Sequence, residues 1–317
     1  MHRVSSLAIV SCSPGIPNFS PERGGLVNLI FDAIITGILT GGVYALMASG
    51  LTLVFGVMDI INVGQGALVI LGAYLSYVLQ QNFHIDLFVG LLITLPLMFL
   101  FGLVIEWFFI RPIKRDRTML SILVTYGVAL IIEGVLNLIF SANNVKLQAW
   151  YVTASFRIGD FYLAYIYVFG FLLAAVLLGG LYLMLYRTKF GHSIRASMEN
   201  RTAAQLIGIN VDRISAVTFG IGIALAAAGG MAFGATNAFN AGSSYDLISR
   251  LLAIIIFGGM GSLSGALIAA VSMLVIEDVT SVLWSPVWAS TVFFILLVII
   301  LVVRPQGLLG RAEGRKQ

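Results

Sequence analysis

The sequence predicts an all-α, polytopic integral membrane protein, and three observations support this prediction. Of the 317 residues, 59% are hydrophobic and only 10% are charged, whereas soluble domains average about 25% charged residues. A soluble fold of this length has too little interior to bury so much apolar surface. The apolar runs are long and continuous, which is typical of membrane-spanning helices and not of strands with alternating polarity.

Seven hydrophobic blocks define the expected elements. A span needs about 20 residues, so we expect the first block to form a tilted helix, or a helix broken at Gly41-Gly42 or near Gly50. The last block is interrupted at 258–265 and 281–286, so it holds at least two passes and a half-helix. We therefore expect about eight transmembrane helical segments, with nine or ten as alternatives, and two glycine-rich helix breaks. The blocks are 26–58, 64–80, 86–110, 118–140, 161–186, 214–236 and 246–303.

Residues 26–310 are expected to form a single transmembrane domain with short tails on either side. Residues 1–25 are polar and contain three prolines, so we interpret them as a disordered tail or as the product of an upstream start codon wrongly chosen. Residues 311–317 form the C-terminal tail.

Lysine and arginine in short loops predict the orientation of the chain. The loops 111–117 and 187–213 and the region from Arg304 onward hold 13 of the 18 basic residues, so all three are expected to be cytoplasmic. The segments 81–86 and 141–160 hold few or none, and we expect them outside. The side of the N-terminus stays open.

The sequence contains no motif for a reaction of its own. The phosphate loop G-x-x-x-x-G-K-[ST], the zinc helix H-E-x-x-H and the G-x-S-x-G elbow are all absent. Cys12 is the only cysteine, which excludes a disulfide framework, and His2, His84 and His192 lie far apart. We therefore expect no enzyme activity, no cofactor and no bound metal. The net charge of +4 follows from the basic loops and requires no nucleic-acid partner.

Two glycine-rich segments, one in each half of the chain, form a weak internal repeat. Phe55–Met58 is followed by Gly66-Ala67-Leu68, and Phe257–Met260 is followed by Gly265-Ala266-Leu267. Transporters built from two repeats often place such breaks near the substrate path. The polar side chains at these breaks must face protein or water, so we consider them candidates for a translocation path, with helix–helix bridging as the alternative. They are Asn62, Gln65, Ser262 and Ser264.

Ionisable side chains within membrane spans are costly and often functional. Glu106, Arg250 and the pair Glu277-Asp278 lie near the ends of their segments, where we expect them to reach water. Glu133 lies near the middle of its block. A carrier driven by an ion gradient would need such a residue, so a secondary carrier is one alternative, and a purely structural membrane subunit is another.

The loop 187–213 is predicted to contain a docking helix. From Ser193 to Leu206 the residues are good helix formers of mixed charge, and Gly208 is suited to end the helix at the C′ position. Such a helix would fit a groove on a cytoplasmic partner, and a solvated connector is the alternative. The side chains expected on one face are Ala203, Leu206 and Ile207.

At this loop the chain resembles a known family. Glu199, Ala203, Ala204 and Gly208-Ile209, placed between membrane spans, are similar to the coupling segment of bacterial ABC importer permeases. More narrowly, motifs in the same order across about residues 26 to 310 resemble branched-chain amino acid permeases of the LivH type. These motifs are Gly42–Leu46, Gly50–Gly56, Gly208–Arg213, Ala216–Phe219, Gly258–Ala266 and Arg304–Gly310.

The resemblance implies a permease that moves leucine, isoleucine and valine across the bacterial inner membrane into the cytoplasm. It implies two cytoplasmic ATP-binding subunits, a second permease subunit of the LivM type and an extracytoplasmic substrate-binding protein as partners. The residues expected to couple to the ATPase are Glu199, Asn200, Ala203, Ala204, Gly208 and Ile209.

The sequence departs from the family pattern at two positions. Val63-Gly64-Gln65-Gly66 stands where the family commonly has Phe-Ala-His-Gly, and Ser264 stands where a proline is common. The first departure lies at a candidate channel position. Urea and short amides, which close relatives carry, therefore remain alternative substrates.

Overall fold

The computed structural model describes residues 23–113, 116–158 and 161–310. The predicted tails therefore lie outside the described residues, except that residues 23–25 begin the first helix. The elements are α1 (Arg23–Met58), α2 (Gln65–Phe83), α3 (Leu87–Ile105), the π-helix η1 (Glu106–Ile110), α4 (Arg117–Phe140), α5 (Trp150–Thr153), β1 (Ser155–Ile158), β2 (Phe161–Ala164), α6 (Tyr165–Arg187), α7 (Lys189–Glu199), α8 (Arg201–Leu206), α9 (Val211–Thr236), α10 (Ser243–Gly258), α11 (Leu263–Leu283) and α12 (Pro286–Val303).

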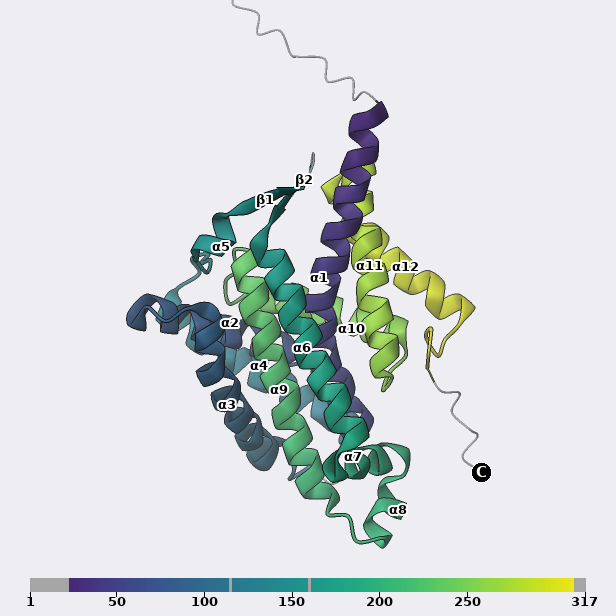
Figure 1. Cartoon of the computed structure of the whole chain (residues 1–317). Helices are drawn as coiled ribbons and strands as arrows, with labels where there is room; N and C mark the ends of the chain where they lie inside the picture. Colours follow the sequence, from purple (N-terminus) through teal and green to yellow (C-terminus); the bar gives the residue numbers. More distant parts are fainter. Residues whose placement is uncertain (1–22, 114–115, 159–160, 311–317) are drawn as a thin grey trace, which may run out of the picture.

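The predicted polytopic helical fold is confirmed (Figure 1). Seven helices of the described chain are long and apolar enough to cross a membrane, whereas about eight segments were expected. Two other long helices, α2 and α10, do not meet this requirement. With 16 residues, α10 is shorter than the span of about 20 residues that a bilayer requires, and α2 ends in the polar run Gln80-Gln81-Asn82.

The helix α1 runs unbroken over 36 residues. Its length of about 54 Å, at about 1.5 Å per residue, exceeds the hydrocarbon thickness of about 30 Å. A break at Gly41-Gly42 or Gly50 is therefore wrong, and the Arg23 end extends beyond the bundle (Figure 1). The glycines of α1 serve packing instead. A Cβ atom at Gly41 would lie 2.8 Å from the Val271 Cα atom of α11, so the two backbones touch.

The core of the bundle forms around α9, which is mostly buried and packs against α1, α2 and α3. Close approach is possible because the contact positions are small residues. A Cβ atom at Gly222 would lie 2.8 Å from the Gly50 carbonyl oxygen of α1, and one at Gly230 would overlap the Val69 carbonyl oxygen of α2.

The loops gather at two ends of the bundle. At one end lie α7, α8 and the residues after α12, where Met198 contacts Gly56 and Gly259 lies against Gly310. The described part of 111–117 lies at the same end, because the Thr118 hydroxyl donates to the Asp59 carbonyl oxygen at 3.0 Å. The opposite end carries α5 and the start of α1 (Figure 1). The described parts of the three basic regions thus lie at the same end of the molecule.

A short antiparallel hairpin, β1–β2, lies at the opposite end from α7 and α8 (Figure 1). Its register pairs Ser155 with Ala164 and Ile158 with Phe161. The sequence analysis predicted an outside loop over 141–160 and did not predict these strands. The segment after α9 contains the buried Phe239, which forms an isolated antiparallel bridge with Val145.

We predict that Gly230→Ala destabilises the protein, because the added methyl group would overlap the Val69 backbone. Overpacking of a well-packed core costs about 1–3 kcal/mol. The measurement is the thermal unfolding midpoint of the purified chain in detergent. Gly179→Ala is the matched control, since no atom lies within 4 Å of a Cβ there. Equal midpoints for the two variants would contradict this account of the core.

Candidate functional site

The loop between α6 and α9 folds into two helices, so the predicted single helix from Ser193 to Leu206 is wrong. Asn200 interrupts it with an extended backbone (φ −155°, ψ 106°). The Asn200 side chain accepts a hydrogen bond from the Ala203 amide at 2.9 Å and thereby caps α8. An N-cap of this kind satisfies an amide that otherwise has no partner, which favours a new helix start over continuation. Ala203 and Leu206 thus belong to a separate short helix.

The turn after α8 agrees with the sequence prediction. Gly208 has φ +87°, a backbone conformation that side-chain-bearing residues rarely adopt. Its amide donates to the Gln205 carbonyl oxygen at 3.0 Å and the Ile209 amide donates to the Ala204 carbonyl oxygen at 3.0 Å. Gly208 therefore ends α8 at the C′ position.

The exposed apolar side chains of this segment lie at the end of α8. Leu206 is 84% exposed and Ile207 is 75% exposed. Ala204, in contrast, is buried and faces the protein, although the sequence analysis grouped it with residues that contact a partner. The other predicted coupling residues are exposed or half-buried: Glu199, Asn200, Ala203, Gly208 and Ile209.

The two short helices are attached to the transmembrane core. Arg201 of α8 pairs with Asp212 in the first turn of α9 at 3.5 Å. The Met198 side chain of α7 lies against Gly56 of α1, and Gly191 lies against the backbone of Leu185 at the end of α6. A force applied to α7 and α8 would therefore reach three membrane helices directly.

The polar residues of the first break form a buried bridge. Asn62 and Gln65 are 1% and 0% exposed. The Asn62 amide nitrogen donates to the Gln65 side-chain oxygen at 3.0 Å, and the Gln65 nitrogen donates to the Gly222 carbonyl oxygen of α9 at 3.3 Å. In this conformation they link α2 to α9, which is the bridging alternative considered from the sequence.

The polar residues of the second break lie elsewhere and are less buried. The Ser262 hydroxyl accepts a hydrogen bond from the Gly265 amide at 3.1 Å and caps α11, while Ser264 is exposed. Gly261 approaches the end of α1, since a Cβ there would lie 3.8 Å from the Gly56 Cα atom. No hydrogen bond within the described chain joins this pair to Asn62 and Gln65, so the four candidates form two separate pairs.

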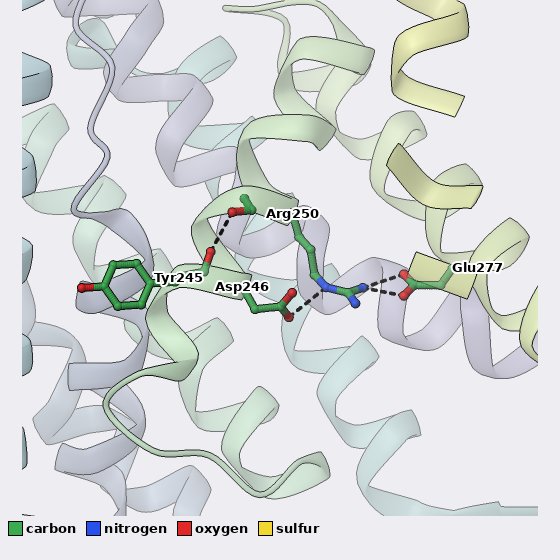
Figure 2. A network of polar contacts seen from close by, with 5 residues as sticks. Tyr245, Asp246, Arg250 and Glu277 are labelled. Carbon is green, nitrogen blue, oxygen red and sulfur yellow. Dashed lines mark hydrogen bonds and ion pairs between the residues drawn. The ribbon is translucent and has the colours of Figure 1, made fainter. Parts of the chain in front are cut away.

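A charged network connects α10 to α11 (Figure 2). One Arg250 guanidinium nitrogen, Nη1, donates to both Glu277 oxygens at 2.6 and 2.7 Å, and Nε donates to Asp246 at 3.0 Å. The Asp246–Arg250 contact follows from their i, i+4 spacing, which the sequence analysis did not use. The contact with Glu277 joins two helices and could not be derived from spacing.

Several expectations for the ionisable residues need correction. Glu277 and Glu106 were expected to reach water at segment ends, but both are buried. Glu277 is neutralised by Arg250, whereas one Glu106 carboxylate oxygen has no hydrogen-bond partner within the described chain. Glu133 of α4 is half-buried.

Comparisons with known proteins cover nearly all of the described helices. A family model described as branched-chain amino acid transport system / permease component matches residues 33–301. The chain is 28% identical to the high-affinity branched-chain amino acid transport system permease protein LivH of Salmonella typhimurium, over 89% of this chain and 96% of the relative. It is 27% identical to the protein BraD of Pseudomonas aeruginosa, which has the same description, over 89% of this chain and 96% of the relative.

A more distant relative is the permease protein LivM of Salmonella typhimurium, of the same high-affinity system. It is 25% identical over 84% of this chain and 68% of the relative. No solved structure matches the chain.

We predict that Glu277→Ala destabilises the protein, because it removes the shielded carboxylate that pairs with Arg250 and leaves only the exposed Asp246 as its partner. Removing one member of a buried ion pair costs about 3–5 kcal/mol. The measurement is the thermal unfolding midpoint in detergent. The double variant Arg250→Met/Glu277→Leu should recover much of the loss, since it removes both charges and retains apolar volume. A single variant as stable as the unmodified chain would argue against the pair as a structural lock.

Proposed function

Because the chain belongs to the family of branched-chain amino acid transport system permease components, we propose that it is the membrane-spanning permease subunit of a bacterial ABC importer. It translocates leucine, isoleucine and valine into the cytoplasm. The observation that carries this proposal is the family match over residues 33–301. This range covers all or part of each helix that is long and apolar enough to cross a membrane. The names of LivH and BraD support the same substrate class.

The energy for transport comes from separate subunits. The sequence contains no phosphate loop, so two cytoplasmic ATP-binding subunits supply it, and the chain catalyses no reaction itself. A second permease subunit completes the membrane part, and LivM, a relative of this chain, is the model for it. An extracytoplasmic binding protein delivers the substrate.

The ATP-binding subunits dock on the face formed by α8 and its terminal turn. Leu206 and Ile207 are exposed apolar side chains on the end of the molecule that also holds the basic loops, and this end faces the cytoplasm by the positive-inside rule. They act as the anchors of the contact. Around them lie the polar or small residues that complete the surface, Glu199, Asn200, Ala203, Gly208 and Ile209, while Ala204 supports α8 from beneath.

ATP binding closes the ATPase pair and displaces α7 and α8. The displacement reaches α9 through the Arg201–Asp212 ion pair and reaches α1 through Met198 and Gly56. The membrane helices then rearrange between outward-facing and inward-facing states, each stabilised by different contacts. Opening a path beside α9 requires the Gln65–Gly222 hydrogen bond to exchange partners. Asn62 and Gln65, with Ser262 and Ser264 at the second break, then line that path.

The proposal is tested by purifying the chain from its native membrane in mild detergent and identifying the accompanying proteins by mass spectrometry. The expected result is an ATPase with a phosphate loop and a second permease in stable ratio, and ATP-dependent uptake of labelled leucine after reconstitution with the binding protein. A chain that is isolated alone and moves solute without ATP would overturn the proposal. ATP-dependent uptake of urea without leucine would retain the importer and change the substrate.

We predict that Leu206→Asp weakens association with the ATP-binding subunits by about thirtyfold, since losing an interface anchor costs about 2 kcal/mol and about 1.4 kcal/mol is tenfold. Leucine uptake should fall in parallel. Co-purification and uptake in proteoliposomes are the measurements. Leu206→Met, which retains an apolar side chain, is the control and should behave like the unmodified chain. Full association of the aspartate variant would refute the anchor role.

We predict that Gly208→Pro abolishes uptake while membrane insertion stays normal. Proline fixes φ near −65° and has no amide hydrogen, whereas this position has φ +87° and donates to Gln205. The terminal turn of α8 would therefore be lost without affecting any transmembrane helix.

Glu199→Lys, which reverses an exposed charge at the end of α7, should also abolish uptake. The readouts are uptake and the amount of chain in the membrane fraction, and normal uptake in both variants would disprove the coupling role.

A further inference from the structure

Arg250 on α10 holds two carboxylates that differ sharply in exposure. The side chain of Glu277 is 11% exposed and that of Arg250 is 15% exposed, but the side chain of Asp246 is 65% exposed. The contact with Glu277 is short and shielded from water, so we take it as the more stable of the two ion pairs. The contact with Asp246 is a single bond between residues one helical turn apart, open on one side. Contacts of this exposed kind are weak and exchange readily.

The guanidinium group retains unused donors beside Asp246. Nε donates to Asp246 and Nη1 donates to Glu277, while Nη2 has no hydrogen-bond partner among the described residues. In Figure 2 the guanidinium group lies between the two carboxylates. A planar guanidinium with two free N–H groups is suited to bind a further carboxylate. The exposed Asp246 carboxylate next to it is suited to bind an ammonium group.

The Asp246–Arg250 pair lies beside a helix that is expected to span the membrane. Glu277 lies within α11, a helix apolar enough to span the bilayer, nearer its Leu283 end, which is the end away from α7 and α8. The exposed Asp246 carboxylate lies on α10 beside that helix. A charged group is unfavourable against lipid, so Asp246 must face water or another subunit. Tyr245, Asp246 and Ser249 are all exposed on the same stretch of α10. This polar surface therefore faces water or another subunit in the outer part of the membrane.

We propose that Asp246 and Arg250 form a contact site for a zwitterionic α-amino acid on its way through the importer. The substrate ammonium group binds the Asp246 carboxylate, and the substrate carboxylate binds the free N–H groups of Arg250. The substrate thereby replaces the Asp246–Arg250 bond within α10, and the Arg250–Glu277 pair keeps the guanidinium in place. The inference rests on the proposed importer function and adds to it the side chains that distinguish amino acids from neutral urea and amides.

The test uses the whole importer complex in lipid nanodiscs without the binding protein. Binding of leucine is measured by saturation-transfer NMR, which detects weak ligands. Competitors are 4-methylpentanoate, which lacks the ammonium group, 3-methylbutan-1-amine, which lacks the carboxylate, and urea. Because each analogue leaves one charged partner unpaired, it should compete about tenfold more weakly than unlabelled leucine. Equal competition by the analogues would overturn the inference, and this measurement needs no variant.

The decisive variant is Asp246→Asn, which is nearly isosteric and leaves the Arg250–Glu277 pair intact. It should weaken leucine binding by about tenfold while 4-methylpentanoate binds as well or better, since that analogue makes no ammonium contact and no longer competes with the Asp246 carboxylate for Arg250. Ser249→Ala, an uncharged change on the same exposed stretch of α10, is the control. If Asp246 only stabilised the helix, both ligands would weaken together. That result, or full leucine binding by the variant, would overturn the inference.

Uptake separates failure of the site from failure of the proposed function. With the binding protein restored, the Asp246→Asn complex should hydrolyse ATP at the unmodified rate but move fewer leucine molecules per ATP. If the unmodified complex moves no leucine with ATP, the importer proposal itself fails. If it moves leucine and the variant matches it in leucine moved per ATP, only the assignment of Asp246 and Arg250 is wrong.

Discussion

The bilayer offers no hydrogen-bond partners, and most of the polar architecture of this protein follows from that constraint. At two places where the described chain leaves helical geometry, nearby polar side chains supply hydrogen bonds. At the first break, Asn62 and Gln65 bond each other and the Gly222 carbonyl oxygen. At the second, Ser262 caps the next helix. The breaks are therefore permitted only because specific polar residues occupy them.

Small residues make this arrangement sterically feasible. Since lipid is as apolar as leucine, helices in a membrane associate through close packing and hydrogen bonds instead of through the hydrophobic effect. Gly50 lets the backbones of α1 and α9 meet at Gly222, and it leaves room for the Gln65 side chain of α2, whose nitrogen would lie 3.2 Å from a Cβ atom at Gly50 and donates to Gly222. Close packing and polar satisfaction thus occur at the same place, beside α9.

The charged groups divide into two functional kinds. Arg250 and Glu277 are shielded and neutralise each other, which suits a fixed support between α10 and α11. The Asp246–Arg250 and Arg201–Asp212 pairs each include an exposed carboxylate, and under the proposed mechanism these are the contacts that change partners. A transporter needs both kinds, because rigid elements must move relative to one another while the charges at their edges exchange contacts at little cost.

The sequence by itself determined the helical membrane fold, the sorting of basic loops to one end and the turn at Gly208, because composition, charge distribution and glycine geometry act locally. Only the tertiary structure decided that α1 is continuous, that Asn200 divides the docking segment, that Ala204 faces inward and that Glu277 is buried against Arg250. A continuous α1 requires neighbours that accept its glycines, and an ion pair between residues 250 and 277 requires two helices to meet at one height. Such contacts depend on packing between distant segments, which local sequence patterns do not encode.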